Sequence, residues 1–92
     1  MTDADLLNAL RDCYHLQRNV VDLNLIRHAT LTPDPEAPGL IPRFLATITL
    51  VAPTSDDTTT AQLLAQIENR LLGLQPISRV AITLLPALFT IL

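Results

Sequence analysis

Lysine and tryptophan are missing from this sequence, and aromatic residues make up only 3% of it. All six basic residues are arginines, they are scattered, and the formal net charge is -3. A surface that follows a phosphate backbone needs clustered Lys or Arg, so we do not expect nucleic-acid binding. With few aromatic rings to bury, the core has to be built from Leu, Ile, Val and Ala.

Cysteine and long apolar runs are equally scarce. Cys13 is the single cysteine, which excludes an internal disulfide and a cysteine-rich metal finger. The first residues lack the basic flank and apolar core of a signal peptide. The most apolar segment, 80–92, is shorter than the roughly 20 residues of a membrane-spanning helix, and Pro86 interrupts it. We therefore expect one soluble, cytoplasmic domain with no membrane partner.

The sequence that remains is organised around an alternating segment followed by a helical repeat. Residues 43–51 alternate and are rich in β-branched side chains, which predicts a strand that ends before Pro53. Thr59, with a glutamine three residues later, has capping-box spacing, and leucines and isoleucines at helical intervals predict a helix over 59–72. Gly73 is expected to end this helix in a left-handed conformation.

The same two periodicities predict the other elements. They predict a helix over 3–14 and strands over 25–31 and 78–85. Polar residues, asparagine and proline predict the segments between them: a polar break over 15–18, a turn near 22–24 and a proline-rich loop over 32–42. The order α-β-β-α-β favours an α/β (α+β) fold, a small two-layer sandwich with a mixed sheet and both helices on one face. We expect an antiparallel hairpin and then a parallel crossover, with the apolar tail after Pro86 packed on the sheet or on a second subunit.

Two segments resemble motifs of a known family. Residues 19–26, Asn-Val-Val-Asp-Leu-Asn-Leu-Ile, resemble the Asn-Ile-Val-Asp-Leu-Gly-Leu-Ile signature of the iron–sulfur cluster assembly domain family. Residues 49–56, Thr-Leu-Val-Ala-Pro-Thr-Ser-Asp, resemble its Thr-Leu-Thr-Thr-Pro-Gly-Cys-Pro motif. The family includes SufT-like and PaaD-like proteins of metal–sulfur cluster biosynthesis and the N-terminal domain of some cluster-carrier ATPases. The helix and the strand ending at Pro86 follow in the family's order, so the resemblance implies one such domain over 1–92.

The resemblance implies a site made of Asp22, Pro53, Thr54 and Ser55. Ser55 stands where the family has its loop cysteine, Thr54 replaces the glycine and Asp56 the following proline. A thiolate at a helix N-terminus is a soft ligand suited to iron–sulfur chemistry, whereas a serine hydroxyl is neutral and a poor ligand for soft metals. Asp56 and Asp57 are expected to satisfy helix N–H groups and to repel anions, which also disfavours a phosphate site.

The first motif carries its own changes. The Asp-Pro-Glu that usually precedes it is Cys13-Tyr14-His15 here, and Asn24 replaces its glycine at a position where Asn tolerates positive φ. Asp22 either positions the loop or accepts backbone N–H bonds across its own turn. Cys13 is expected to be buried on the apolar face of the first helix. His15 and His28, which lack ligand spacing, are expected on the surface or in loops.

Three functional hypotheses follow. The leading one is a non-enzymatic accessory protein without catalytic residues, which binds a cluster scaffold, a recipient apoprotein or a cysteine-bearing homologous subunit; an iron–sulfur cluster or iron would be held only transiently. The second is a metal or cluster carrier that uses Cys13 with Asp22 or a histidine such as His15. The third is an enzyme that uses Ser55, although no nucleophile-elbow glycines surround it. A homodimer through the final strand and the tail is also open.

Overall fold

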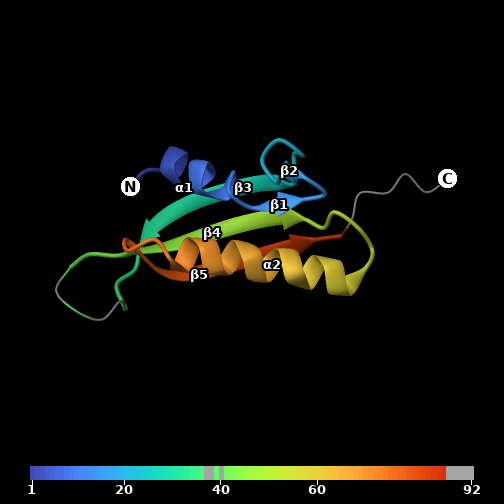
Figure 1. The fold of residues 1–92 in the computed structure, drawn as a ribbon. Helices are drawn as coiled ribbons and strands as arrows, with labels where there is room; N and C mark the ends of the chain where they lie inside the picture. Colours follow the sequence, from blue (N-terminus) through green and yellow to red (C-terminus); the bar gives the residue numbers. More distant parts are fainter. Residues whose placement is uncertain (37–38, 40, 87–92) are drawn as a thin grey trace.

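The computed structural model describes residues 1–36, 39 and 41–86, and these form an α+β domain of two helices and five strands (Figure 1). The elements are α1 (Asp3–Leu10), β1 (Tyr14–His15), β2 (Arg18–Asn19), β3 (Ile26–Pro33), β4 (Phe44–Val51), α2 (Asp57–Leu72) and β5 (Ile77–Leu85). The predicted fold class is confirmed. None of the helices in the described ranges is long and apolar enough to cross a bilayer.

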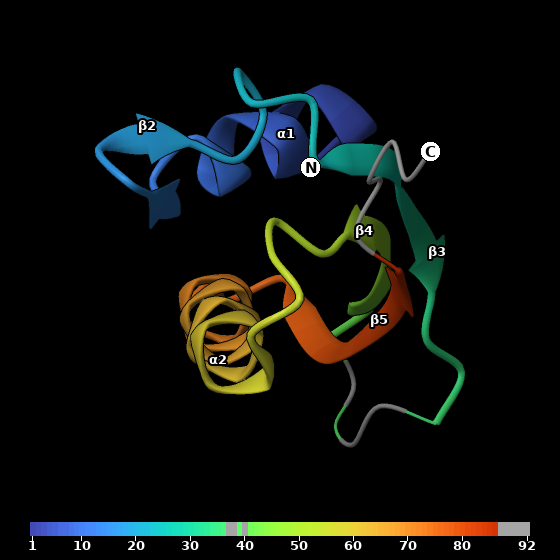
Figure 2. The ribbon, with the colours of Figure 1, turned by 90° about the vertical axis from the view of Figure 1, so that its right-hand side faces the viewer.

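The main sheet has three strands in the order β3-β4-β5. β3 pairs antiparallel with β4, and β4 pairs parallel with β5, so the hairpin and the crossover are both as predicted. Along β4, Ala46, Ile48 and Leu50 are fully buried. Both helices cover this face of the sheet (Figure 2). The molecule is therefore a two-layer sandwich around one core.

The core lies between the helices and this inner face of the sheet, and it is aliphatic. Its buried members are Leu6, Ala9, Leu10, Cys13, Val20, Ala46, Ile48, Leu50, Leu63, Ile67, Leu71 and Ile77. On α2 the buried leucines and isoleucine recur every four residues, which is the spacing that puts them on one face of a helix. The absence of buried aromatic rings in this cluster agrees with the composition.

The opposite, outer face of the sheet is rich in threonine. The strand register places His28, Thr49 and Thr83 in one row and Thr30, Thr47 and Ala81 in the next. Threonine combines high strand propensity with a polar hydroxyl, so it suits a face that no helix covers. The two faces therefore differ in chemistry as well as in burial.

The first helix is shorter than predicted and is followed by a hairpin. α1 begins with a capping box between Thr2 and Asp5, which the sequence predictions did not include, and ends at Leu10 rather than at position 14. The expected polar break is instead the tight turn of the β1–β2 hairpin. Leu16 and Gln17 form this turn with φ values of 51° and 70°, which neither residue type favours. No local sequence signal marks such a turn.

The second helix also differs at both ends. α2 begins at Asp57 and its N-cap is Asp56, so the predicted capping box at Thr59 is wrong: Thr59 lies within the helix. Gly73 has φ −72°, a right-handed conformation, so the left-handed helix end is wrong too. The helix ends because Leu74 N–H and Ile77 N–H bond to carbonyls three residues back, which tightens the chain toward Pro76.

The turn before β3 and the loop after it lie close to where the sequence predicts them. Asn24 has φ 59°, which confirms the turn that the motif asparagine was expected to support. β3 runs to Pro33, two residues beyond the predicted strand, because Thr32 and Pro33 still pair with β4. The loop to β4 is correspondingly shorter. The expectation that the apolar tail packs on the sheet concerns residues 87–92, which lie outside the described ranges.

Candidate functional site

The two segments that carry the family resemblance lie against one another. The backbone N–H of Val51, at the end of β4, donates to the carbonyl of Leu25 at 2.7 Å. Leu25 belongs to the first motif and Val51 to the second. Figure 1 shows the turn after β2, the end of β4 and the loop into α2 at the same end of the sheet. The fold thus places the two segments at the same end of the sheet.

Asp22 is held by side chains rather than by the backbone of its own turn. Its carboxylate accepts from Asn19 Nδ2 at 2.9 Å and pairs with Arg11 at 3.2 Å, and its backbone N–H donates to Asn19 Oδ1 at 2.9 Å. The expectation of backbone N–H bonds to this carboxylate is therefore wrong. Asn19 and Asp22 close the turn reciprocally, and Arg11 fastens the turn to the end of α1. Both charged side chains are half-exposed.

The loop between β4 and α2 is ordered by its own hydroxyl and carboxylate groups. Thr54 Oγ1 accepts from the backbone N–H of Asp56 at 3.3 Å, and the Thr54 carbonyl accepts from the Thr60 hydroxyl at 3.4 Å. Thr60 is buried, so its hydroxyl contacts the loop from the inner side of the helix. Pro53 and Thr54 are half-buried, whereas Ser55 and Asp22 are exposed.

Asp56 occupies the N-terminus of α2. Its carboxylate accepts from the backbone N–H of Thr58 at 3.3 Å and from the hydroxyl of Thr59. The hydrogen bond from Thr59 is the main reason why the pKa of Asp56 lies below its ordinary value. The position at the helix N-terminus that binds an anion in other proteins is thus occupied here by the chain's own carboxylate, which accepts from the Thr58 N–H. The predicted capping role of Asp56 is confirmed.

Ser55 is exposed beside this carboxylate. Its side chain makes no hydrogen bond with any other residue in the described ranges, so no base holds the hydroxyl for nucleophilic attack. The geometry gives the Ser55 enzyme hypothesis no support. The position can still be reached from solution, as a contact residue must be.

Cys13 is fully buried in the core, between the end of α1 and β1 rather than on the helix itself. Its Sγ lies 4.0 Å from the carbonyl oxygen of Gln66, and burial raises the pKa of the thiol. His15 is half-buried in β1, and His28 is exposed on β3. Over residues 1–36, 39 and 41–86 no group of three or more His, Cys, Asp or Glu side chains is arranged to hold a metal ion. The carrier hypothesis needs a reachable thiol, and Cys13 does not provide one in this structure.

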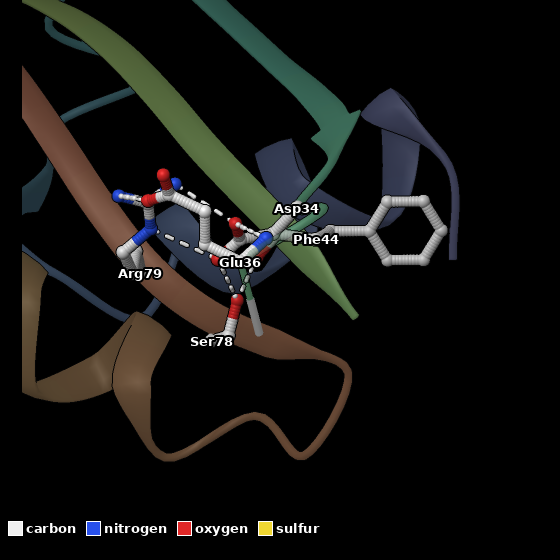
Figure 3. Close-up of polar contacts among 5 residues, drawn as sticks. All are labelled: Asp34, Glu36, Phe44, Ser78 and Arg79. Carbon is white, nitrogen blue, oxygen red and sulfur yellow. Dashed lines mark hydrogen bonds and ion pairs between the residues drawn. The ribbon is translucent and has the colours of Figure 1, made fainter. Parts of the chain in front are cut away.

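A polar cluster that the sequence did not indicate joins β3 to β5 (Figure 3). The Asp34 carboxylate is almost fully buried and accepts two bonds from the Arg79 guanidinium, at 2.8 and 2.9 Å. It also accepts from the Ser78 hydroxyl at 2.6 Å and from the backbone N–H of Glu36 at 3.0 Å. These bonds, those from Arg79 foremost, lower the pKa of Asp34 to about 2.

This Asp34 cluster holds the loop after β3 onto the far strand of the sheet. Glu36 adds a second carboxylate 3.4 Å from Arg79, and Ser78 also lies 3.2 Å from the carbonyl of Phe44. Every acceptor position on Asp34 faces a donor of this chain, and this saturation is typical of a structural ion pair. The partners are 44 and 45 residues apart in the sequence, so periodicity alone had no means of pairing them.

In comparisons with known proteins, no family model, no curated protein and no solved structure matches this chain.

Proposed function

We propose that this protein is a non-enzymatic accessory factor of iron–sulfur cluster assembly that acts by binding protein partners. The partner would be a cluster scaffold, a recipient apoprotein or a homologous subunit that keeps the loop cysteine. The proposal rests on the resemblance of residues 19–26 and 49–56 to the family's motifs. The observation that carries it is the bond between Val51 N–H and the Leu25 carbonyl, which joins the two segments at one end of the sheet.

The chemistry at this end of the molecule favours contact over ligation. Ser55 replaces the thiol, and the neighbouring Asp56 already caps the helix N-terminus. Iron in iron–sulfur clusters is held by thiolates, and the one thiol of this chain is buried in the core. In the proposed role the partner supplies the cluster ligands, while this chain supplies a preformed surface around the exposed Ser55.

The test has two parts, and the first asks whether the chain alone takes up a cluster. The wild type and the Cys13→Ala and Ser55→Cys variants are incubated anaerobically with iron and sulfide, desalted, and examined by absorption spectroscopy and metal analysis. We expect substoichiometric iron on the wild type and Cys13→Ala. Stoichiometric cluster on the wild type that Cys13→Ala abolishes would overturn the proposal and restore the carrier hypothesis.

The second part asks for binding. The probe is a purified iron–sulfur assembly domain that keeps the loop cysteine, mixed with this protein and followed by native mass spectrometry. We expect a complex that Ser55→Lys weakens by about tenfold or more, because a charge is added at the contact surface. Ile41→Lys is the matched control, since Ile41 is exposed in the loop between β3 and β4 at the opposite end of the sheet. No complex, or equal weakening by both variants, would contradict the proposal.

A further inference from the structure

The two edges of the main sheet differ in whether their outward-facing backbone groups have a partner among the described residues. At the β3 edge the backbone N–H of Leu31 donates to the Asp3 carboxylate at 3.0 Å, and α1 packs alongside. The pairing of β3 is also irregular between Ile26 and His28, and Pro33 closes the strand. Bulges, prolines and covering elements are the devices by which proteins prevent a sheet edge from pairing with another chain. The β3 edge has all three.

On β5 these devices are confined to the ends of the strand and to its helix-covered face. The register shift lies beside Phe44 at the start of the strand, Pro86 follows its last residue, and α2 packs against β5. No strand lies beyond β5 in the described sheet. Residues 79–85, Arg-Val-Ala-Ile-Thr-Leu-Leu, contain no proline, no lysine and no acidic residue, and the pairing with β4 is regular over this stretch. The one charge, Arg79, is held by Asp34. A regular strand of this length at an edge, whose single charge is already paired, is a template for a further strand.

The register identifies the backbone groups that face outward. The carbonyl of Leu85 accepts from the N–H of Ala52 at 2.9 Å, so Leu85 presents its backbone groups to β4. Backbone groups alternate along a strand, so Val80, Ile82 and Leu84 present their N–H and C=O groups away from the sheet. No backbone hydrogen bond to these outward groups occurs among the residues that the structure describes.

We propose that the β5 edge binds the β5 edge of a second copy of this chain, antiparallel, about a two-fold axis at Ile82. In this register Ile82 faces its own copy, and Val80 of each chain faces Leu84 of the other. All three outward-facing residues then form hydrogen-bonded pairs, which gives about six backbone hydrogen bonds across the axis. The two three-stranded sheets become one continuous sheet. This inference does not depend on the proposed function.

The strand fits a second copy better than an unrelated peptide because it is complementary to itself. A two-fold interface requires each residue to tolerate its symmetry partner. On the inner face the register pairs apolar side chains with one another, and Leu84, which is 43% exposed in the single chain, is placed opposite Val80. On the outer face it pairs Ala81 with Thr83, which are both small and uncharged. A shift by two residues in either direction leaves one outward-facing residue unpaired.

Charge placed at Ala81 and Thr83 tests both the pairing and the register. Both side chains are exposed on the outer face, so substitutions there leave the core intact. The register puts residue 81 of one chain opposite residue 83 of the other, so Ala81→Lys/Thr83→Lys sets like charges face to face, and Ala81→Glu/Thr83→Glu does the same. A mixture of the two variants sets opposite charges face to face. Thr30→Lys/Thr32→Lys on β3 is the matched control, because it adds the same charge at the protected edge.

The readout is the dimer dissociation constant from native mass spectrometry and light scattering of the full chain. We expect a wild-type dimer, about tenfold or greater weakening in each charged β5 variant, recovery in the mixture as a heterodimer, and no change in the β3 control. A monomeric wild type across the micromolar range would overturn the proposal. So would a dimer that the β5 variants leave unchanged, or a monomer that binds an unrelated extended peptide at β5 instead.

Discussion

The side-chain amide of Gln66 bonds to both backbone groups of Tyr14. Gln66 Oε1 accepts from the Tyr14 N–H at 2.7 Å, and Gln66 Nε2 donates to the Tyr14 carbonyl at 3.1 Å. Gln66 lies on α2 and Tyr14 on β1, so one side chain fastens the short hairpin to the helix. A two-residue strand pair has little stability of its own, and this amide compensates for that weakness.

Gln66→Ala should therefore lower the free energy of unfolding by about 1–2 kcal/mol, because two hydrogen bonds are lost at once. Gln62→Ala is the matched control: Gln62 is exposed on the same helix, and its side chain makes no hydrogen bond in the described ranges. The change in helix propensity is the same in both variants. Urea unfolding followed by circular dichroism measures the difference, and equal effects would show that the amide contributes nothing.

Substitutions in the turn of the β1–β2 hairpin should stabilise the fold. Leu16 and Gln17 both have positive φ, and Leu16 is 83% exposed. Asn-Gly is the residue pair that such a two-residue turn favours. Leu16→Asn/Gln17→Gly should raise the free energy of unfolding by about 1 kcal/mol, since the backbone strain is relieved and no buried contact is lost. A decrease in the urea midpoint would show that the exposed leucine is needed where it stands.

The two glycines should respond to alanine with opposite signs. Gly73 has φ −72°, and a Cβ added there would lie 3.4 Å from the Arg70 carbonyl oxygen, an ordinary contact. Gly73→Ala should raise the free energy of unfolding by about 0.4–1 kcal/mol, because alanine lowers the conformational entropy of the unfolded chain. Gly39 has φ 95°, which strains any other side chain, so Gly39→Ala should destabilise the fold. Thermal unfolding of both variants checks the signs, and a destabilised Gly73→Ala would restore the left-handed helix end.

The Asp34 cluster should make the stability of the fold depend on pH in the acidic range. The pKa of Asp34 is about 2 in the folded chain against an ordinary value of 3.8, so its contribution to stability is present above about pH 4 and is lost as the pH falls through about 2. Asp34→Asn should lower the melting temperature by roughly 5 °C at pH 7. The difference from the wild type should shrink between about pH 4 and pH 2. Glu36→Gln is the control, because Glu36 is exposed and only borders Arg79, and it should change little. A wild-type difference that is constant from pH 7 to pH 2 would contradict the assignment.

Thiol labelling compares the accessibility of Cys13 with that of position 55, where the family has its loop cysteine. Cys13 is fully buried, so a disulfide reagent should modify the native wild type at least about 100-fold more slowly than the urea-unfolded chain. Ser55→Cys should add one thiol that reacts at once in the native state, because the loop is exposed. Rapid modification of the wild type would make Cys13 a reachable ligand and would revive the carrier hypothesis.

The sequence predicted the larger elements because their signals are local. Alternation along 43–51 and the four-residue repeat on α2 each report the burial of one face, and the structure has both. The predictions are wrong where the structure depends on residues that are far apart in the sequence or on an uncommon backbone conformation. Nothing nearby forces Leu16 into a left-handed conformation. The N-cap of α2 is Asp56 rather than Thr59, and the Thr59 hydroxyl donates to the Asp56 carboxylate instead of capping the helix itself.

The candidate site followed a different pattern. A backbone hydrogen bond between Val51 and Leu25 joins the two segments that carry the resemblance. The sequence pattern did not predict which side chains bond to one another. The Asp22 carboxylate bonds to the side chains of Asn19 and Arg11 rather than to the backbone of its own turn. The Asp34 carboxylate bonds to Arg79, which lies on the strand at the other edge of the sheet. Such pairings depend on three-dimensional neighbours that no spacing encodes.

The aliphatic core has an optical consequence. The chain has no tryptophan, and its one tyrosine, Tyr14, is 53% exposed on the hairpin rather than buried in the core. Tyrosine fluorescence therefore reports the release of the hairpin from Gln66, whereas far-ultraviolet circular dichroism reports the helices. Followed together in one titration, the two signals give separate readings for the hairpin and for the rest of the molecule, without any label.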